Sequence, residues 1–372
     1  MTDLGIVSAL GCGVVETEKR LFAGDASGMK TCTGTLPNGE TTPFGYADLP
    51  ASAFAAAPTR VAALLDAALA QLEPALARLR KRMPSARIGA VVGTSNSTME
   101  EFTSDPTRID MAYPAERLRD KWGVGGPQWV VSTACSSSGK VFAGARKLLE
   151  TGLCDAVLVG GADAFTRVVV NGFFALEALS PRPTHPLAAD RDGINLGEGA
   201  AMFVMRRAED VPRGGPSVAL LGVGESSDAH HLTAPDPEGR GAEAAMRAAL
   251  ADAKLPPSAV GYVNLHGTGT VYNDAMECAA VRRVFGDGVP CSSTKPLTGH
   301  ALGAAGAVEA ALCWIALRRG RGLPPHVVRP VDRALAPFPV PEVGNDAVAS
   351  VALSNSFAFG GSNACVVLGR NR

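Results

Sequence analysis

Short apolar segments alternate with longer alanine-rich segments along most of this chain. The short segments are rich in β-branched residues and are bounded by glycine, proline or charged residues, which predicts buried strands. We expect strands at Ile88–Val92, Trp129–Thr133, Ala156–Val159, Ala201–Met205, Val218–Val223, Val260–Leu265, Ala349–Leu353 and Ala364–Leu368. This alternation is typical of an α/β protein whose sheets are covered by helices on both faces.

The longer segments carry apolar residues at helical spacing. We expect helices at Val61–Arg82, Ser137–Glu150, Gly241–Ala253, Asp274–Phe285 and His300–Leu317. Pro74 should end or kink the first of these, because proline lacks the N–H that continues a helix. Ala301–Leu317 is the most apolar long stretch, but glycines and Glu309 interrupt it. We therefore interpret it as a buried helix and not as a membrane span.

Two parts of the pattern resemble each other. Val131–Ser138 leads into one alanine-rich helix and Cys291–His300 leads into another, while Ala156–Gly161 resembles Val351–Asn355. Such self-similarity is a weak repeat signal. It predicts two related halves, residues 1–210 and residues 211–372, joined near Val211–Pro216. An active site between them would draw a nucleophile from the first half and bases from the second.

Cys135 lies where the predicted strand Trp129–Thr133 meets the predicted helix Ser137–Glu150. A thiol at the positive end of a helix has its thiolate favoured by unpaired backbone N–H groups and by the helix dipole. Small residues on both sides leave room for a bulky acyl group. Most cysteines are small buried apolar residues, and the other seven of the eight keep that interpretation. Cys135 is the predicted nucleophile.

Two histidine motifs downstream suit such a nucleophile. His266 follows a predicted strand and opens a glycine-rich loop, with Thr268 and Thr270 beside it. Lys295 and His300 flank a turn, and His300 is expected to begin a helix, where a neutral imidazole is favoured. A lone histidine is more often structural than catalytic. These two lie in turns that glycine allows to approach a ligand closely.

Two further features complete the predicted constellation. Glu309 lies on the apolar helix that follows His300, so we expect a buried carboxylate paired with Lys295. Asn355–Asn363 is a glycine-rich turn between two strands, whose backbone N–H groups could face a developing oxyanion. The chain has no Walker lysine–serine pair, which argues against a phosphate-binding loop.

Composition and charge exclude several other classes of protein. The chain has 372 residues, 46% of them hydrophobic, and its 35 basic and 36 acidic residues leave a net charge of −1. This balance argues against nucleic acid as the main partner. The cysteines show no zinc-ligand spacing, so we expect no metal ion. Scattered thiols and the absence of a secretory signal predict a cytoplasmic protein, not one at a membrane.

The ordered motifs resemble the β-ketoacyl-[acyl-carrier-protein] synthases of the elongating Cys–His–His type. The matching segments span nearly the whole chain: Thr133–Ser136, Asp155–Asp163, Asp190–Gly193, Gly197–Gly199, Ser227–Pro235, His266–Thr270, Lys295, Gly299–Gly306 and Phe357–Asn363. The resemblance implies a thiolase-like, five-layered αβαβα fold built from two pseudo-repeated halves. It also implies decarboxylative Claisen condensation of a malonyl group with an acyl group, in fatty-acid or polyketide and polyene elongation.

The resemblance further implies a role for each candidate residue. Cys135 would take the acyl chain from the phosphopantetheine thioester of an acyl carrier protein. His266 and His300 would promote decarboxylation of the malonyl thioester and stabilise the enolate. The oxyanion hole would be the N–H groups of Cys135 and Phe359, and Phe359 would gate the pocket. Lys295 and Glu309 would keep the His300 side in order, while Thr268, Thr270 and Phe357 would contact the substrate. No cofactor is implied.

The family pairs two subunits through the strand before the nucleophile, here Gln128–Thr133. We therefore expect a dimer, homomeric by default, with a heterodimer with a related ketosynthase-like subunit left open. Thr94–Gln128 of the neighbouring subunit would help to shape the pocket. Arginines near the pocket mouth would bind the acidic carrier protein.

The chain departs from the family pattern at four places. The strand before the N-terminal glycine turn is almost absent, so the first sheet should lack much of an edge. Thr94–Gln128 is short, Ala358 replaces a glycine of the gate, and Thr184–Pro186 replaces the usual Arg-Pro-Phe. These differences bear on chain-length preference and leave the chemistry intact.

Two alternatives stay open at this point. A thiolase-type or starter-condensing relative would act on coenzyme A thioesters, but it would normally pair its cysteine with His and Asn or with a second Cys. A non-catalytic chain-length partner would have lost its nucleophile, whereas Cys135, His266 and His300 are all present.

Overall fold

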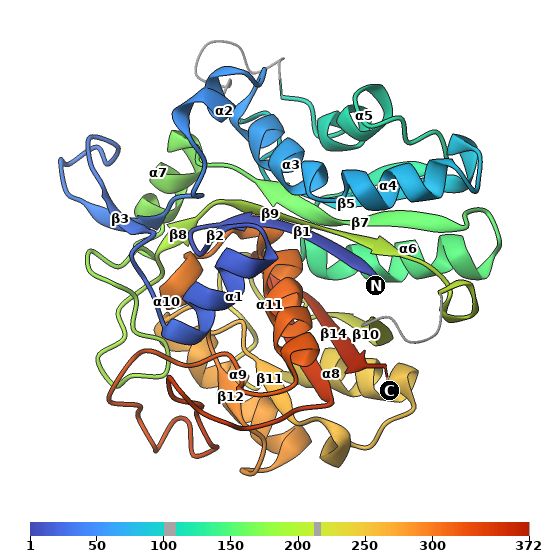
Figure 1. Ribbon diagram of the computed structural model, residues 1–372. Helices are drawn as coiled ribbons and strands as arrows, with labels where there is room; N and C mark the ends of the chain where they lie inside the picture. Colours follow the sequence, from blue (N-terminus) through green and yellow to red (C-terminus); the bar gives the residue numbers. More distant parts are fainter. Residues whose placement is uncertain (100–108, 212–216, 372) are drawn as a thin grey trace.

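The computed structural model describes residues 1–99, 109–211 and 217–371. Two β-sheets lie roughly one above the other, with helices outside each sheet and a helical layer between them (Figure 1). The predicted five-layered α/β architecture is confirmed. A small third sheet joins β3 (Met29–Cys32), β4 (Thr42–Gly45) and β8 (Leu196–Gly197) beside these layers.

The two large sheets repeat one topology. The first has six strands in the order β2-β1-β9-β7-β5-β6, and the second has five in the order β10-β14-β13-β11-β12. β2 is an extra strand at one edge of the first sheet. When the other five strands of each sheet are numbered in chain order, both sheets have the spatial order 1-5-4-2-3. In both sheets the first two neighbouring pairs are antiparallel and the last two are parallel. The chain therefore folds the same motif twice, as the weak repeat in the sequence predicted.

Every strand that the sequence predicted is present, with bounds that differ by up to four residues, whereas β2 and β12 were not predicted. The first sheet contains β1 (Asp3–Ser8), β2 (Gly11–Cys12), β5 (Ile88–Gly93), β6 (Gln128–Val131), β7 (Ala156–Asp163) and β9 (Gly199–Met205). The second contains β10 (Val218–Ser227), β11 (Tyr262–Asn264), β12 (Cys291–Ser292), β13 (Val351–Phe357) and β14 (Ser362–Arg370). β5, β7 and β9 are buried along their whole length because helices cover both faces.

Equivalent helices occupy equivalent layers. Between the sheets, α6 (Ser137–Glu150) packs on β5 and β7 and on β14, while α11 (Ala305–Arg319) packs on β9 and on β13. The outer layers hold α3 (Arg60–Ala70), α4 (Glu73–Arg80) and α5 (Tyr113–Asp120) on one side, and α8 (Arg240–Ala253) and α9 (Val271–Phe285) on the other. The remaining helices are α1 (Val14–Ala23), α2 (Ala51–Ala55), α7 (Arg167–Ala175) and α10 (Lys295–Thr298).

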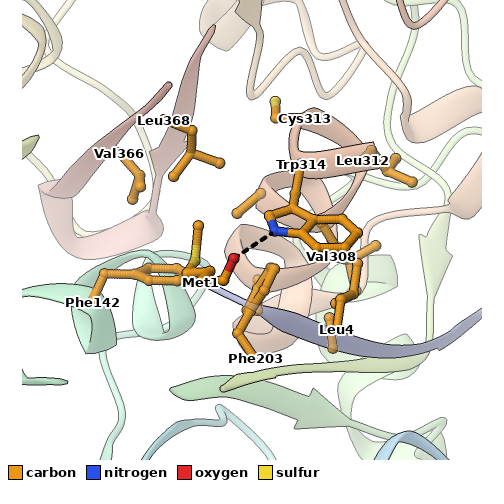
Figure 2. Packing of buried hydrophobic residues seen from close by; sticks show 14 of the residues in the cluster. Met1, Leu4, Phe142, Phe203, Val308, Leu312, Cys313, Trp314, Val366 and Leu368 are labelled. Carbon is orange, nitrogen blue, oxygen red and sulfur yellow. Dashed lines mark hydrogen bonds between the residues drawn. The ribbon is translucent and has the colours of Figure 1, made fainter. Parts of the chain in front are cut away.

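The central layer explains why α11 is so apolar. Every residue from Ala305 to Leu317 is buried, because one helix face meets the first sheet and the other meets the second. Figure 2 shows Trp314 of α11 close to Met1, Phe142 and Phe203, and its indole N–H donates to the carbonyl oxygen of Met1 at 3.3 Å. A helix that is apolar all round belongs inside such a core, as the sequence predicted.

Pro74 ends the first predicted helix as expected: α3 stops at Ala70 and α4 starts at Glu73 with Pro74 in its first turn. The predicted helix beginning at His300 is wrong at its start. Gly299 and Leu302 both have positive φ, at 68° and 53°. A right-handed helix cannot include such residues, so α11 begins only at Ala305.

Three other expectations concerned the N-terminal strand, the strand before Cys135 and the join between the two halves. The N-terminal strand that seemed almost absent is present as β1, which pairs with β9 and with β2. The strand before Cys135 was expected to be buried, but β6 lies at the edge of its sheet with Trp129 38% exposed. The proposed join Val211–Pro216 falls mostly on residues 212–216, which lie outside the described residues.

Candidate active site

Cys135 occupies a tight turn between β6 and α6. Ala134, just before it, has the left-handed φ of 51°, which lets the chain reverse within a few residues. Local hydrogen bonds hold the turn: the Ser137 hydroxyl donates to Ala134 O at 2.6 Å and accepts the Thr133 N–H at 2.9 Å. The thiol is thereby held at the N-terminal end of α6, as the sequence predicted.

The structure brings the two predicted histidines to this thiol. His300 Nε2 lies 2.8 Å from Cys135 Sγ, although the two residues are 165 positions apart. The His266 and His300 rings are 5.2 Å apart between centroids, and they meet edge to face. Lys295 Nζ lies 3.4 Å from His266 Nδ1. One nucleophile therefore faces two imidazoles, with a cation behind them.

The repeated topology explains this convergence. Cys135 follows β6, which is the last strand in the spatial order of the first sheet. His300 comes after β12, which is the last strand in the spatial order of the second sheet. His266 follows β11, the neighbour of β12. His300 is also anchored to the first half, because its N–H donates to Asn195 O at 2.8 Å and its carbonyl accepts the Gly197 N–H at 2.9 Å.

The electrostatics of the thiol differ from the sequence prediction. Burial raises the pKa of Cys135 to about 12, and the Lys295 cation and the Phe359 N–H only partly oppose this effect. Burial therefore outweighs the groups that favour the thiolate, and the pKa lies above its ordinary value and not below it as the sequence suggested. Cys135 therefore rests as a thiol. His300 Nε2 is in place to accept the thiol proton.

Both imidazoles are neutral at ordinary pH. Burial lowers the pKa of His266 and of His300 well below its usual value, and the nearby Lys295 cation lowers each pKa further. An ammonium group has no lone pair, so His266 Nδ1 accepts from Lys295 and the ring proton resides on Nε2. His266 can then donate a hydrogen bond to a bound carbonyl or enolate. The neutral state of His300 comes from burial, and not from the helix start that the sequence suggested.

Lys295 and Glu309 form the buried pair that the sequence predicted. The Lys295 ammonium donates to Glu309 Oε1, and both side chains are almost fully buried. Burial raises the pKa of Glu309 to about 7, while Lys295 opposes the rise. Neither residue lines the pocket. The pair therefore acts from behind the histidines. Its hydrogen-bond contact is with His266 and not with His300, on which Lys295 acts through its charge alone.

Sequence reasoning missed a second carboxylate behind the histidines. Glu277 accepts the N–H groups of His266 and Gly267 at 2.8 and 2.7 Å, and it also accepts the Asn355 amide at 2.9 Å. Burial raises the pKa of Glu277 to about 7. Its position on the buried side of α9, three residues after the buried Asp274, was the available signal. Acidic side chains are almost never fully buried unless they are paired, so two of them on the buried face of one helix indicate that both have partners.

Asp163, at the end of β7, was also missed as an organising residue. This buried carboxylate accepts the N–H of Gly303 at 2.6 Å, two further N–H groups from Ser95 and Asn96, and the hydroxyls of Thr94 and Ser95. It joins the loop after β5 to the turn that follows His300. The signal for it was a lone acid at the end of an otherwise apolar strand.

A pocket of about 320 Å³ opens in front of Cys135. The predicted residues that line it are Cys135, His266, Thr268, Thr270, His300, Phe357 and Phe359. The Phe359 ring stacks on Phe173 of α7 with centroids 5.6 Å apart, and its backbone N–H bonds the thiol of Cys135. The Thr268 and Thr270 hydroxyls lie 2.9 Å apart, and both residues line the same pocket. The arrangement can transfer an acyl group to sulfur and hold an oxyanion.

Comparison with known proteins adds family evidence. Residues 61–211 match the model for the beta-ketoacyl synthase N-terminal domain, and residues 218–328 match that for the C-terminal domain. Nodulation protein E of Rhizobium meliloti is 41% identical over 254 residues, which cover 65% of this chain and 61% of that protein. The 3-oxoacyl-[acyl-carrier-protein] synthase 2 of Staphylococcus aureus (strain COL) is 33% identical over 314 residues, covering 76% of this chain and 74% of that one. The match thus spans about three fifths of the length of nodulation protein E.

Solved structures extend the likeness to the whole chain. The ketosynthase ApeO in complex with its chain length factor ApeC, from Xenorhabdus doucetiae, contains a chain that is 38% identical with a TM-score of 0.89, covering 100% of this chain and 97% of that one. The ishigamide ketosynthase/chain length factor gives 28% identity and a TM-score of 0.88, covering 100% and 98%. Within the residues that the structure describes, no helix is both long and apolar enough to cross a bilayer.

Proposed function

Because this chain belongs to the β-ketoacyl synthase family and has its thiolase-like fold, we propose that it joins an acyl group and a malonyl group in a decarboxylative Claisen condensation. The acyl and malonyl groups would both arrive on acyl carrier protein, in fatty-acid or polyketide and polyene elongation. The observation that carries the proposal is the 2.8 Å contact between Cys135 Sγ and His300 Nε2, with the His266 ring beside it.

The first half-reaction loads the enzyme. Cys135 Sγ attacks the thioester carbon of the acyl carrier protein as its proton passes to His300 Nε2. The negative charge that develops on the thioester oxygen is held by the backbone N–H groups of Cys135 and Phe359. The pantetheine sulfur then leaves and takes the proton from His300. The Phe359 N–H already contacts the thiol, which supports its place in this oxyanion hole.

The second half-reaction forms the carbon–carbon bond. The malonyl carboxylate leaves as CO₂, and the electron pair of the broken bond forms an enolate on the thioester. The N–H of His266 Nε2 stabilises the enolate oxygen. His300 joins it as the second donor once the ring proton of this neutral imidazole resides on Nε2 instead of Nδ1. The enolate carbon attacks the acyl-Cys135 carbonyl, and the Cys135 sulfur leaves as a thiolate that takes up one proton from water to restore the resting thiol. Lys295 supports this step, because its contact at 3.4 Å keeps the His266 proton on Nε2.

The substrate would reach Cys135 through the pocket in front of it. We propose that Thr268 and Thr270 bind the pantetheine arm and that Phe357 contacts the substrate. Phe359 would gate the acyl chain, since its ring stands at the pocket against Phe173. The eight unpaired cysteines fit a reducing compartment, and we place the enzyme in the cytoplasm.

The two alternative functions are less well supported. A thiolase-type enzyme would normally pair its cysteine with His and Asn or with a second Cys. Here the two bases at the site are both imidazoles, His266 and His300, and Cys135 is the single cysteine among the described residues that line the pocket. A non-catalytic chain-length subunit would not require the neutral histidines that lie around Cys135. Both observations favour an active ketosynthase.

Intact-protein and peptide mass spectrometry would test the proposed function. After incubation with a panel of acyl carrier protein thioesters, the enzyme should gain one acyl group, and peptide mapping should place it on Cys135. Adding malonyl carrier protein should release that group as a β-ketoacyl product two carbons longer. Acylation of Cys154 or Cys291 instead would contradict the assignment, and a coenzyme A thioester used as readily as the carrier would favour the thiolase-type alternative.

We further propose that the enzyme works as a dimer joined through β6. Within the described chain β6 has a neighbouring strand on one side only, β5, and its Trp129 is 38% exposed. An apolar free edge favours pairing with another chain. A homodimer is the simplest assembly. The neighbours that are complexes of a ketosynthase with its chain length factor support a heterodimer with a related subunit as the other form.

Light scattering at micromolar concentration should therefore give the mass of a dimer, and Val130→Lys at the β6 edge should shift it towards monomer.

Affinity for the acidic carrier protein should fall as salt rises, because surface charge interactions are screened within about 8–10 Å at 0.1–0.15 M salt. Arg240→Glu, next to the pocket residues and 76% exposed, should weaken carrier binding. The control Arg119→Glu on α5 should not. A stable, active monomer or salt-independent affinity would contradict these proposals.

A further inference from the structure

His326 is a buried imidazole outside the pocket that none of the preceding chemistry uses. It lies in the segment after α11 and is 1% exposed. Its Nδ1 lies 3.3 Å from the backbone N–H of Ser293, and its Nε2 lies 3.1 Å from the carbonyl oxygen of Pro186. A carbonyl oxygen only accepts, so Nε2 carries the proton and Nδ1 accepts from Ser293. The ring is therefore a neutral bridge, and burial lowers its pKa to about 4.

The Ser293 end of this bridge leads to both sides of the His266–Lys295 contact. The Ser293 hydroxyl donates to Gly267 O at 2.6 Å and accepts the backbone N–H of Lys295 at 3.3 Å. Gly267 directly follows His266, and its φ of +38° brings the backbone so close that a Cβ there would lie 2.6 Å from Ser293 Cβ. Any shift of Ser293 would therefore move His266 and Lys295 relative to each other.

The Pro186 end of the bridge leads to the other loops of the site. Two residues before Pro186, the Thr184 hydroxyl donates to Gly193 O at 2.7 Å, and Thr268 O lies 3.1 Å from the same hydroxyl oxygen. The Thr184 N–H donates to Asn195 Oδ1 at 2.7 Å. Asn195 O in turn accepts the N–H of His300. The His326 ring thus spans the gap between the segment that carries Lys295 and the segment that supports His300.

We propose that His326 is a positioning residue for decarboxylation, acting through Ser293 on the alignment of His266 with Lys295. This inference rests on the proposed condensation and deepens it. His326 touches neither substrate nor Cys135. Its loss should therefore slow the step that depends on His266 and should spare transfer of the acyl group to Cys135.

Three variants at this position separate the two ends of the bridge. His326→Phe keeps a ring of similar size and loses both hydrogen bonds. His326→Asn keeps an acceptor where Nδ1 meets Ser293, and His326→Gln keeps a donor where Nε2 meets Pro186. The readouts are kcat and KM for decarboxylation of malonyl carrier protein, and the rate of Cys135 acylation measured by mass spectrometry.

For His326→Phe we expect kcat for decarboxylation to fall by about tenfold or more, since small misplacements of a catalytic group have effects of that order. KM and the acylation rate should change by less than about twofold. His326→Asn should recover most of the lost kcat, and His326→Gln should not. Trp314→Phe, which removes the distant bond to Met1 O together with core packing and the contact with Arg318, is the control for general destabilisation, matched by its melting temperature.

Several outcomes would overturn this inference. One is a His326→Phe enzyme with wild-type kcat. Another is an equal loss of acylation and decarboxylation that Trp314→Phe reproduces at the same melting temperature, which would mean a purely structural role. If His326→Gln recovered the lost kcat and His326→Asn did not, the proposed action of His326 through Ser293 would be rejected. Failure of the proposed function itself is distinguishable, because the wild-type enzyme would then neither acylate Cys135 nor release CO₂.

Discussion

Replacing Cys135 by alanine should abolish condensation and leave decarboxylation of the malonyl thioester measurable. The substitution removes one sulfur from the turn before α6 and leaves the contact between His266 and Lys295 untouched. Decarboxylation needs the imidazoles and the N–H donors but no covalent acyl-enzyme. Condensation has no route without the thiol, because the acyl group then has no attachment point beside the enolate. CO₂ release and β-ketoacyl product should be measured in the same samples.

His266→Ala and His300→Ala are the matched comparisons for that experiment. Each should reduce decarboxylation and condensation together, by about a hundredfold or more, which is the usual effect of removing one oxyanion or acid–base group. His300→Ala should also slow Cys135 acylation, because the thiol loses the base that lies 2.8 Å away. If His300→Ala condensed at a normal rate, the assignment of this residue would be wrong.

The second large effect is expected at Lys295. Lys295→Ala should lower the free energy of unfolding by about 3–5 kcal/mol, because it leaves Glu309 buried without its partner. Activity should fall with it, since His266 Nδ1 loses the donor that fixes its tautomer. Chemical denaturation of Lys295→Ala, Glu309→Gln and the double variant gives the coupling between the two side chains. A double variant no worse than either single one is the expected result, and simple additivity of two large losses would contradict the pairing.

This loss of stability should depend on pH in a defined direction. Burial already raises the pKa of Glu309 to about 7, and the Lys295 cation is what opposes a further rise. Without Lys295 the folded protein keeps Glu309 protonated to higher pH, while the unfolded chain ionises it near its ordinary pKa of 4.5. The folded state then binds more protons than the unfolded state, so stability falls as pH rises above that value. The deficit of Lys295→Ala should therefore be smaller at pH 6 than at pH 8.

The amino-acid sequence by itself determined the local structure and the identity of the main reacting groups. Apolar periodicity predicted α6 with the bounds Ser137–Glu150 that the structure has, and it placed Cys135 at the start of that helix. Patterning succeeds there because a helix is held by hydrogen bonds between near neighbours. A buried, paired Glu309 was also predictable, because an isolated charge on an apolar helix needs a partner. The resemblance to the family supplied Lys295 as that partner, and the structure has the pair.

Only the tertiary structure decided the electrostatics and the supports of the site. The thiol of Cys135 was expected to ionise readily, yet burial raises its pKa to about 12, and burial is a property of the whole fold. The turn after His300 bends away from a helix because the chain must also reach Asn195 and Gly197 of the other half. The sequence marks Glu277 and Asp163 only as acids in apolar surroundings. It does not show which groups they and His326 bind, because those partners lie on distant segments. Chain neighbours define the elements, and contacts between distant segments define the environment in which the same side chains react.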